Sequence, residues 1–168
     1  MNLAQNFAKK MTASMGQTHE VGSMNKVPAK VLEIVKRLKI EPKAVAGADL
    51  KSLSWGKMDV EYRLAKISDV LGISMADFGI AETGTLIFGS SRQAPASLNF
   101  VPEFSIAVLK ESDILETSEE VWAALAEKGP MPRTLNMISG PSKTGDIEQT
   151  LFLGAHGPRE LHVILVKS

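Results

Sequence analysis

Apolar runs of strand length alternate with helical patterns along this chain, and this alternation constrains the fold more than any other feature. Continuous apolar runs are typical of strands that are buried on both faces of a sheet. Strands that alternate with helices favour one α/β domain with a mostly parallel sheet. The expected strands are residues 43–47, 69–73, 85–88, 104–109, 135–138 and 161–166.

Two helices are marked by their spacing and by the residues at their ends. In residues 27–38, apolar side chains recur at i, i+3, i+4 and i+7 from Val31, and Pro28 suits a first helical turn. The second helix starts with the Thr-x-x-Glu capping box of residues 117–120 and ends at Gly129. The basic residues at the end of the first helix complement its dipole.

The last third of the chain predicts a strand–helix–strand unit. Residues 135–138 and 161–166 are the strands, and residues 146–153 are the helix. Such a unit implies neighbouring parallel strands and a right-handed crossover. Residues 74–77 predict a single capped helical turn.

Composition excludes several classes of protein. The 168 residues, 44% of them hydrophobic, are enough for one folded domain with a full core, residues 1–168. The absence of cysteine excludes disulfides, thiol chemistry and iron–sulfur clusters held by this chain. No secretory signal and no long apolar run is present, so we expect a cytoplasmic protein without a membrane span.

The net charge of the chain is zero, but its two halves carry net charges of opposite sign. Residues 1–66 hold 12 Lys and Arg against 6 Asp and Glu, whereas residues 67–168 hold 7 against 13. Such asymmetry can mark a nucleic-acid surface, but the basic residues here are spread thinly and few aromatic residues accompany them. We therefore expect no nucleic-acid partner, and favour a solvated helix face or a contact with an acidic partner.

Ligands of open parallel sheets bind beyond the carboxyl ends of the strands, where we expect residues 79–85, 139–146 and 154–159 to lie. Residues 139–146 follow a strand and open the expected helix, so free backbone N–H groups would face the loop. Ser142, Lys143 and Thr144 add hydroxyl groups and a cation. The loop is therefore a candidate site for a carboxylate or phosphate; the alternative is that Thr144 or Asp146 only caps the helix.

Glu82 and His156 are the other residues with chemical potential. A partly desolvated carboxylate at Glu82 could act as a base or nucleophile; alternatively, it is a turn residue in water or an ion-pair partner of Arg92 or Arg159. His156 could bind a ligand or transfer a proton. The histidines show no metal-ligand spacing, and no metal site is expected. His162 alternates with apolar residues and is expected in the interior or at a sheet edge.

Three blocks of the sequence resemble the lactate utilisation protein C family, which carries the LUD domain. Residues 76–86 match its A-x-x-x-I-A-E-T-G-T-L signature, residues 139–148 resemble its G-P-S-x-T-x-D-I-E block, and residues 154–163 resemble its G-x-H-G-P-x-x-L-H-V ending. The resemblance covers residues 69–166 well and the first 60 residues loosely. Relative to the family, we expect this chain to lack an opening helical segment.

The resemblance implies a three-layer α/β sandwich of the ribose-phosphate isomerase and CoA-transferase type. It also implies a role in oxidising L-lactate to pyruvate beside partner subunits that carry the iron–sulfur clusters. Glu82 is the candidate catalytic residue, because Glu82–Gly84 is similar to the E-x-G of CoA-transferases. The candidate ligand-binding residues are Thr83, Gly84, Thr85, Ser139, Gly140, Ser142, Thr144, Asp146, Glu148, His156, Gly157 and Arg159.

Three functions remain open on these grounds. The first is a non-redox component of a lactate-oxidising system that binds a small carboxylate or other anion and holds no cofactor itself. The second is a stand-alone CoA-transferase-like or isomerase-like enzyme that uses Glu82. The third is a regulatory binding module. A homo-oligomer is compatible with each of them.

Overall fold

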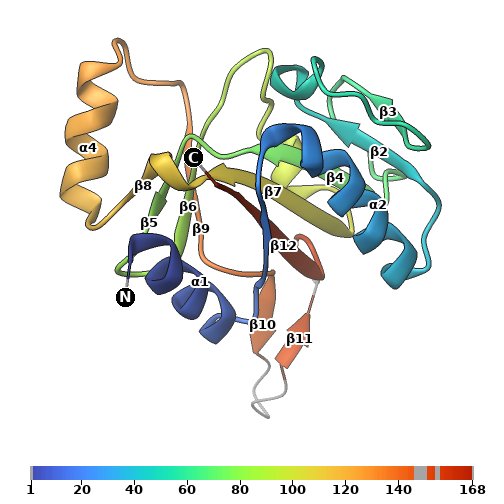
Figure 1. Ribbon diagram of the computed structural model, residues 1–168, viewed down its shortest axis with the longest axis horizontal. Coiled ribbons are helices and arrows are strands. Elements are labelled where there is room, and N and C mark those ends of the chain that lie inside the picture. The colour runs from blue at the N-terminus through green and yellow to red at the C-terminus, as the bar shows by residue number, and fades with distance from the viewer. Residues whose placement is uncertain (1, 146–150, 154–155, 168) are drawn as a thin grey trace.

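Six parallel strands form the central sheet of the computed structural model, which describes residues 2–145, 151–153 and 156–167 (Figure 1). Every neighbouring pair in this sheet is parallel, which confirms the predicted α/β fold with a mostly parallel sheet. From one edge to the other, the strands are β1 (Gln17–Val21), β12 (Glu160–Val166), β7 (Phe104–Lys110), β4 (Leu71–Met75), β2 (Lys43–Ala46) and β3 (Asp59–Glu61).

The side chains of β7 and β12 alternate between two hydrophobic cores, one on each face of the sheet. Ile106 and Val108 of β7 pack toward helix α2 (Val27–Leu38), whereas Ala107 and Leu109 belong to the core on the opposite face. This alternation is the ordinary two-residue period of a strand. It directs Ser105 away from α2. In the same way, β12 directs Leu161 away from α2 and His162 toward it.

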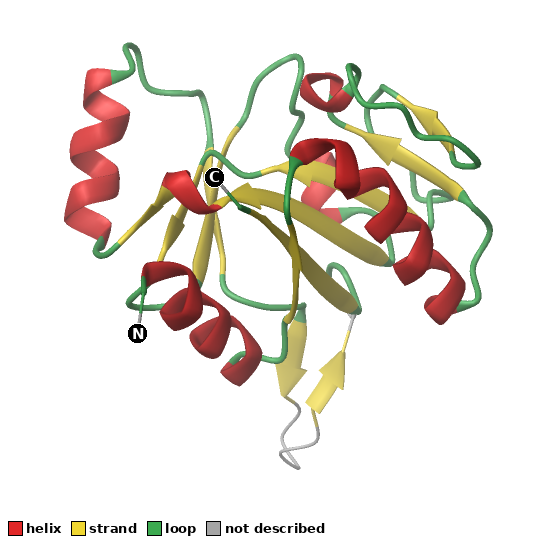
Figure 2. Ribbon diagram, in the orientation of Figure 1, coloured by secondary structure: helices red, strands yellow, loops and turns green. Residues whose placement is uncertain are grey.

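Helix α1 and a second, four-stranded sheet cover the face of the central sheet opposite α2 (Figure 2). Phe88 of this second sheet packs inward against the central sheet, whereas Ile87 packs outward against α4. Both faces of the second sheet are therefore apolar, so the layer opposite α2 contains a covered sheet as well as a helix. The elements are α1 (Leu3–Ala13), β8 (Ile114–Leu115), β5 (Phe78–Ile80), β6 (Thr85–Gly89), β9 (Leu135–Ile138) and α4 (Ser118–Glu127).

The predicted strand–helix–strand unit at the end of the chain is wrong. β9 pairs antiparallel with β6 in the second sheet and does not lie beside β12. Strand β11 (Leu151–Leu153) occupies the end of the expected helix and pairs with β10 (Lys143–Gly145); residues 146–150 lie outside the described residues. A short apolar run such as residues 151–153 suits a helix or a strand equally well, and pairing with β10 decides it here.

The expected helical turn at residues 74–77 is also wrong. Ser74 lies in β4, where its buried hydroxyl donates a hydrogen bond to Asn99 Oδ1 at 2.5 Å. Asp77 Oδ2 accepts from the backbone N–H of Gly89 at 2.6 Å, so this carboxylate closes a strand connection and caps no helix. Other local predictions are confirmed: α2 has its predicted bounds, and Thr117 caps α4 through the predicted capping box. The strand expected at residues 69–73 is present but shifted, as β4.

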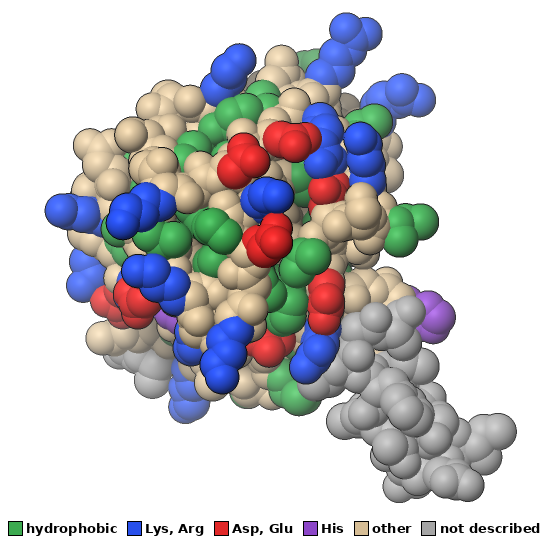
Figure 3. Space-filling model, turned by 90° about the vertical axis from the view of Figure 1, so that its right-hand side faces the viewer, with side chains coloured by type: hydrophobic (Ala, Val, Ile, Leu, Met, Phe, Trp, Pro, Cys, Tyr) green, Lys and Arg blue, Asp and Glu red, His purple; other side chains and the backbone are tan. Residues whose placement is uncertain are grey.

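Basic and acidic side chains are interspersed on the face that carries α2, β2 and β3 (Figure 3). Lys30 and Glu33 of α2 lie 2.6 Å apart, and Arg63 forms an ion pair with Asp69. The positive charge of the N-terminal half is thus partly neutralised locally, as expected of a solvated helix face. Among the described residues, no helix is long and apolar enough to cross a membrane.

Candidate ligand-binding site

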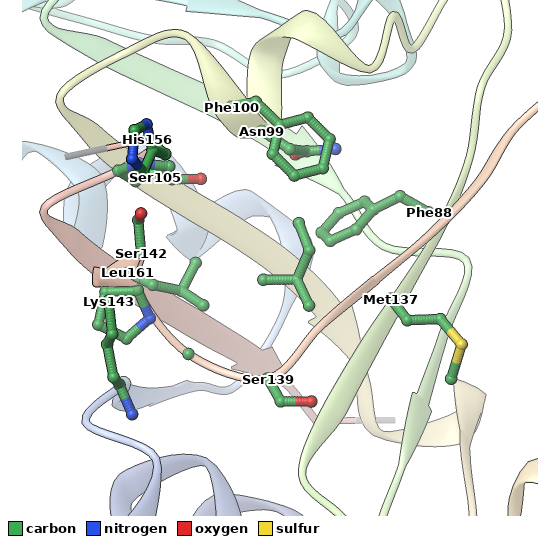
Figure 4. A pocket seen from close by; sticks show the side chains of 15 residues that line it. Phe88, Asn99, Phe100, Ser105, Met137, Ser139, Ser142, Lys143, His156 and Leu161 are labelled. Atoms are coloured by element: carbon green, nitrogen blue, oxygen red, sulfur yellow. The ribbon is translucent and has the colours of Figure 1, made fainter. Parts of the chain in front are cut away.

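A cavity of about 400 Å³ lies on the face of the central sheet opposite α2, beside the amino ends of β7 and β12 (Figure 4). Ser105 and Leu161, the second residues of these two strands, line it. The other walls come from the second sheet, from helix α3 (Ser97–Phe100) and from two of the predicted polar segments. The lining residues that carry the argument are Phe88, Asn99, Phe100, Met137, Ser139, Ser142, Lys143 and His156.

This location corrects the expectation that the site lies at the carboxyl ends of the parallel strands. The backbone N–H of Ser142 donates to Pro158 O at 2.9 Å, and that of Arg159 donates to Glu103 O at 2.7 Å. These two bonds bring the second and third sequence blocks together beside the residue that precedes β7. Two segments that are separate in the sequence therefore share one cavity, at the end of the sheet opposite the one predicted.

Lys143–Gly145 is a strand, and residues 146–150, where the expected helix begins, lie outside the described residues. Side-chain donors for a bound anion are present, because Figure 4 shows Ser142, Lys143 and His156 on one side of the cavity. Among the described lining residues, none is acidic. Lys143 is exposed at the rim of the cavity, and Figure 4 shows its side chain extending away from Phe88 and Phe100. Its positive charge and the hydroxyl groups therefore favour a negatively charged group at the rim.

Five of the predicted ligand-binding residues line this cavity, whereas Thr83, Gly84, Thr85 and Arg159 do not. Thr144 lies in β10, and Asp146 and Glu148 lie outside the described residues. Arg159 is exposed and forms an ion pair with Glu103 at 3.2 Å. The five that line the cavity are Ser139, Gly140, Ser142, His156 and Gly157.

A chain of hydroxyl groups connects the first sequence block to the cavity. The hydroxyl oxygens of Thr83 and Thr85 are 2.7 Å apart, and those of Thr85 and Ser139 are 2.6 Å apart. Thr85 is buried, whereas Thr83 and Ser139 are exposed. Thr85 therefore positions the Ser139 hydroxyl at the cavity without lining the cavity itself.

The glycines of the first two blocks have a packing role against α1 and its end. Gly84 has φ of 68°, and a Cβ added there would lie 2.5 Å from the backbone nitrogen of Met11. Gly140 has φ of 120°, and its Cβ would collide with the backbone oxygen of Ser14. Both positions thus require glycine for conformation and for space, independently of any ligand.

Glu82 lies on the exposed turn between β5 and β6 and does not line the cavity. Its backbone N–H donates to Glu116 O at 3.0 Å. This geometry matches the alternative in which Glu82 is a turn residue that faces water. Its catalytic role stays a prediction.

Sequence reasoning missed the part of the site that α3 and the second sheet supply. Asn99 is 5% exposed, and Ser74 holds its amide in place. Phe100 and Met137 are 42% and 52% exposed, although both side chains are apolar. No local pattern marks these residues, because tertiary contacts alone bring them to the cavity. Within the described ranges, no group of three or more His, Asp or Glu side chains is placed to hold a metal ion.

A second polar cluster lies at the same end of the sheet but on the face toward α2. His162 is fully buried, and its Nδ1 accepts from Arg37 Nη2 at 3.1 Å. Its Nε2 lies 3.2 Å from Glu160 Oε2, and His19 Nε2 lies 3.2 Å from its Nδ1. Gln17 binds both Arg37 and Glu160. The contacts fit a neutral His162 that donates from Nε2 and accepts at Nδ1.

Burial lowers the pKa of His162 to about 3, and the nearby positive charges of His19 and Arg37 act in the same direction. Burial also lowers the pKa of His19, with a further contribution from Arg37. Each ring nitrogen of His162 contacts a partner from this chain. This cluster is therefore a closed structural network, unlike the open cavity on the other face.

Together, the parallel sheet, the second sheet and the lined cavity define an α/β domain with an open, partly polar cavity. Comparison with known proteins then identifies the family: the LUD domain model matches residues 62–166, and the chain belongs to the LUD domain family. A crystal structure of a DUF162 family protein from Deinococcus radiodurans has the same fold, with a TM-score of 0.70. The two chains are 22% identical, and the match covers 98% of this chain and 96% of that one.

Curated relatives match between about half and two thirds of the chain. Lactate utilization protein C of Shouchella clausii is 34% identical over 117 residues, which are 67% of this chain and 51% of that protein. The protein of the same name from Halalkalibacterium halodurans is 34% identical over 118 residues, with the same coverage. A protein of Neisseria meningitidis is 41% identical over 97 residues, 56% of this chain and 41% of that protein. The match thus spans about half the length of these relatives.

Proposed function

We propose that this protein is a non-redox component of a system that oxidises L-lactate to pyruvate, and that it binds an anion in the cavity. The observation that carries this proposal is that two of the three family blocks line one cavity, with Lys143 at its edge and no acidic residue among the described lining. Relatives that are 34% identical to this chain over about two thirds of its length are named for lactate utilisation.

The composition of the chain supports separate roles for this protein and its partner subunits in lactate oxidation. Lactate oxidation removes two electrons, and these 168 residues contain no cysteine to hold an iron–sulfur cluster. In this proposal the electrons pass to cysteine-rich partner subunits, while this protein binds and orients an anionic ligand. A role in the cytoplasm belongs to the same proposal.

Within the cavity, the side chains have separate tasks. Lys143 attracts and neutralises the anionic group, and the hydroxyl groups of Ser139 and Ser142 orient it through hydrogen bonds. The buried Thr85 fixes the Ser139 hydroxyl. His156 lies beside Ser105, at the other end of this side of the cavity from Lys143 (Figure 4), and can donate a further hydrogen bond.

Deletion of the gene from its own host tests this proposal. We expect the deletion strain to grow on pyruvate but not on L-lactate. Returning the wild-type gene should restore growth on L-lactate. The Lys143→Gln variant should restore growth poorly, whereas Lys57→Gln, an exposed lysine outside the cavity, should restore it fully. The purified protein alone should not oxidise lactate. Normal growth of the deletion strain, or rapid lactate oxidation by the pure protein, would contradict the proposal.

A further inference from the structure

We infer that the ligand of this cavity combines a planar aromatic ring with an anionic group, and is larger than lactate. This inference rests on the proposal that the cavity is the ligand-binding site of the protein. It adds the class of ligand, which the family resemblance does not supply.

The size of the cavity is the first argument. A buried cavity of roughly 150 Å³ accommodates benzene, which has six heavy atoms, as lactate does. The cavity here measures about 400 Å³. Lactate alone would leave more than half of it to water, whereas a ligand of two or more fused rings with a charged substituent would fill it.

The distribution of side chains around the cavity is the second argument. Figure 4 shows Phe88 and Met137 on one side and Ser142, Lys143 and His156 on the other, with Phe100 above. The apolar side can hold a ring, and the polar side can hold an anion. Leu161 adds apolar surface on the polar side, but all the polar groups named here lie on that side, which suits a ligand with one apolar and one charged end.

Phe100 supplies the third argument. This aromatic side chain is 42% exposed and borders the cavity, although a phenylalanine gains free energy from burial. An aromatic ring that stacks on Phe100 would bury this surface. Such stacking is insensitive to the identity of the ring, so an aryl carboxylate and a nucleotide share the required chemistry.

Isothermal titration calorimetry on the whole chain tests the inference with two ring-bearing anions, 2-naphthoate and adenosine monophosphate. L-Lactate provides the charge without the ring, and 2-naphthylmethanol provides the ring without the charge. We expect at least one ring-bearing anion to bind about tenfold or more tightly than both controls, and the better of the two identifies the source of the ligand. Lactate or the neutral alcohol binding as tightly, or no binding of either ring-bearing anion, would overturn the inference.

Variants test whether Phe100 binds the ring of the ligand and whether Lys143 binds its charged group. We expect Phe100→Ala to weaken the tighter ring-bearing anion about tenfold and Phe100→Leu to weaken it less. Lys143→Gln should weaken it about fivefold and reduce its dependence on salt, whereas Lys57→Gln should have no effect. If Phe100→Ala does not fold, Phe100→Leu and Lys143→Gln decide the result. Unchanged affinity in folded Phe100 and Lys143 variants would overturn the inference.

The two proposals fail in different ways. If lactate binds and the ring-bearing anions do not, the inference about the ligand is wrong and the role in lactate oxidation is unaffected. If the ring-bearing anions bind but the deletion strain grows normally on lactate, the proposed function is wrong and the ligand class stands.

Discussion

At the amino ends of β7 and β12, the two faces of the central sheet differ. One face carries a buried network of paired polar side chains, and the other carries an open cavity. On the face toward α2, His162 is fully buried, and each of its ring nitrogens contacts a side chain of this protein. On the other face, Ser105 and Leu161 line an open cavity with Lys143 at its edge. Leu161 thus lines the candidate binding site, whereas His162, the next residue of the same strand, belongs to the structural network.

The comparison distinguishes two roles that a polar residue can have in a sheet: pairing within the fold and binding a ligand. A buried polar group costs free energy unless it is paired, so the His162 cluster must be closed to be tolerated. Ser139, Ser142, Lys143 and His156 at the cavity are at least partly exposed to solvent, which leaves them able to exchange water for a ligand. Changes on the α2 face should therefore affect stability, and changes on the cavity face should affect binding.

The largest expected effect is the loss of stability on replacing His162. We expect His162→Leu to lower the free energy of unfolding by about 3 kcal/mol, because Arg37 and Glu160 would lose a buried partner. Denaturant unfolding monitored by circular dichroism measures this change. The matched control is Ser105→Ala, a buried residue near the start of β7 on the other face, which should cost less than about 1 kcal/mol. Equal losses in the two variants would contradict the distinction.

The pH dependence of stability is the next largest effect. His162 has a pKa of about 3 in the folded protein and about 6.5 in the unfolded chain, so the unfolded chain binds the proton first. Stability should therefore fall as the pH drops below about 6.5 and continue to fall toward pH 3. Between pH 7 and pH 5, His162 alone accounts for about 2 kcal/mol.

Unfolding of the wild type and of His162→Leu at these two pH values isolates this contribution. The variant should lose about 2 kcal/mol less than the wild type on acidification. Since the pKa of His19 is also lowered, a smaller residual dependence of the same sign is expected in the variant. If both proteins show the same pH dependence, His162 is not held neutral as described.

A smaller effect is expected from Thr85, which connects the first sequence block to the cavity. Thr85→Val removes the central hydroxyl and should cost about 1 kcal/mol of stability, because Thr83 and Ser139 can bond water instead. Loss of the fixed Ser139 hydroxyl should weaken anion binding about threefold. Thr85→Ser, which keeps the hydroxyl, should restore affinity in calorimetry. Failure of the serine variant to do so would show that Thr85 acts by packing alone.

The smallest effect is expected from Glu82. Its carboxylate is exposed on the β5–β6 turn, so Glu82→Ala should change stability by less than about 0.5 kcal/mol and leave anion binding unchanged. The same unfolding and calorimetric measurements test this expectation. A marked loss of ligand affinity in this variant would mean that the turn reaches the bound ligand, and would revive the enzyme hypothesis.

Local signals predicted four of the six strands of the central sheet, β2, β4, β7 and β12, and the helices α2 and α4, but not β1 and β3. The continuous apolar runs of β7 and β12 and the capping box of Thr117 are local, and each predicted its element. α1 carries a comparable local signal, although it was not among the predicted helices: Asn2 and Gln5 form a capping box, and Phe7 and Met11 are one turn apart and fully buried.

The site was predictable only in part, for a physical reason. The family blocks named Ser139, Ser142 and His156, which do line the cavity. Asn99 and Phe100 reach it because α3 packs against β4 and β7, a contact that no local pattern encodes. The location at the amino ends was missed because it depends on backbone hydrogen bonds, such as Arg159 to Glu103, between distant segments.

Nuclear magnetic resonance of the methionine methyl groups tests the central claim most directly. Met137 lines the cavity, whereas Met24 packs against the core on the α2 face. Titration of methyl-labelled protein with 2-naphthoate should shift the Met137 signal progressively to saturation and leave the Met24 signal unchanged. Saturable shifts at Met24 with Met137 unaffected would place binding on the other face of the sheet and contradict the account.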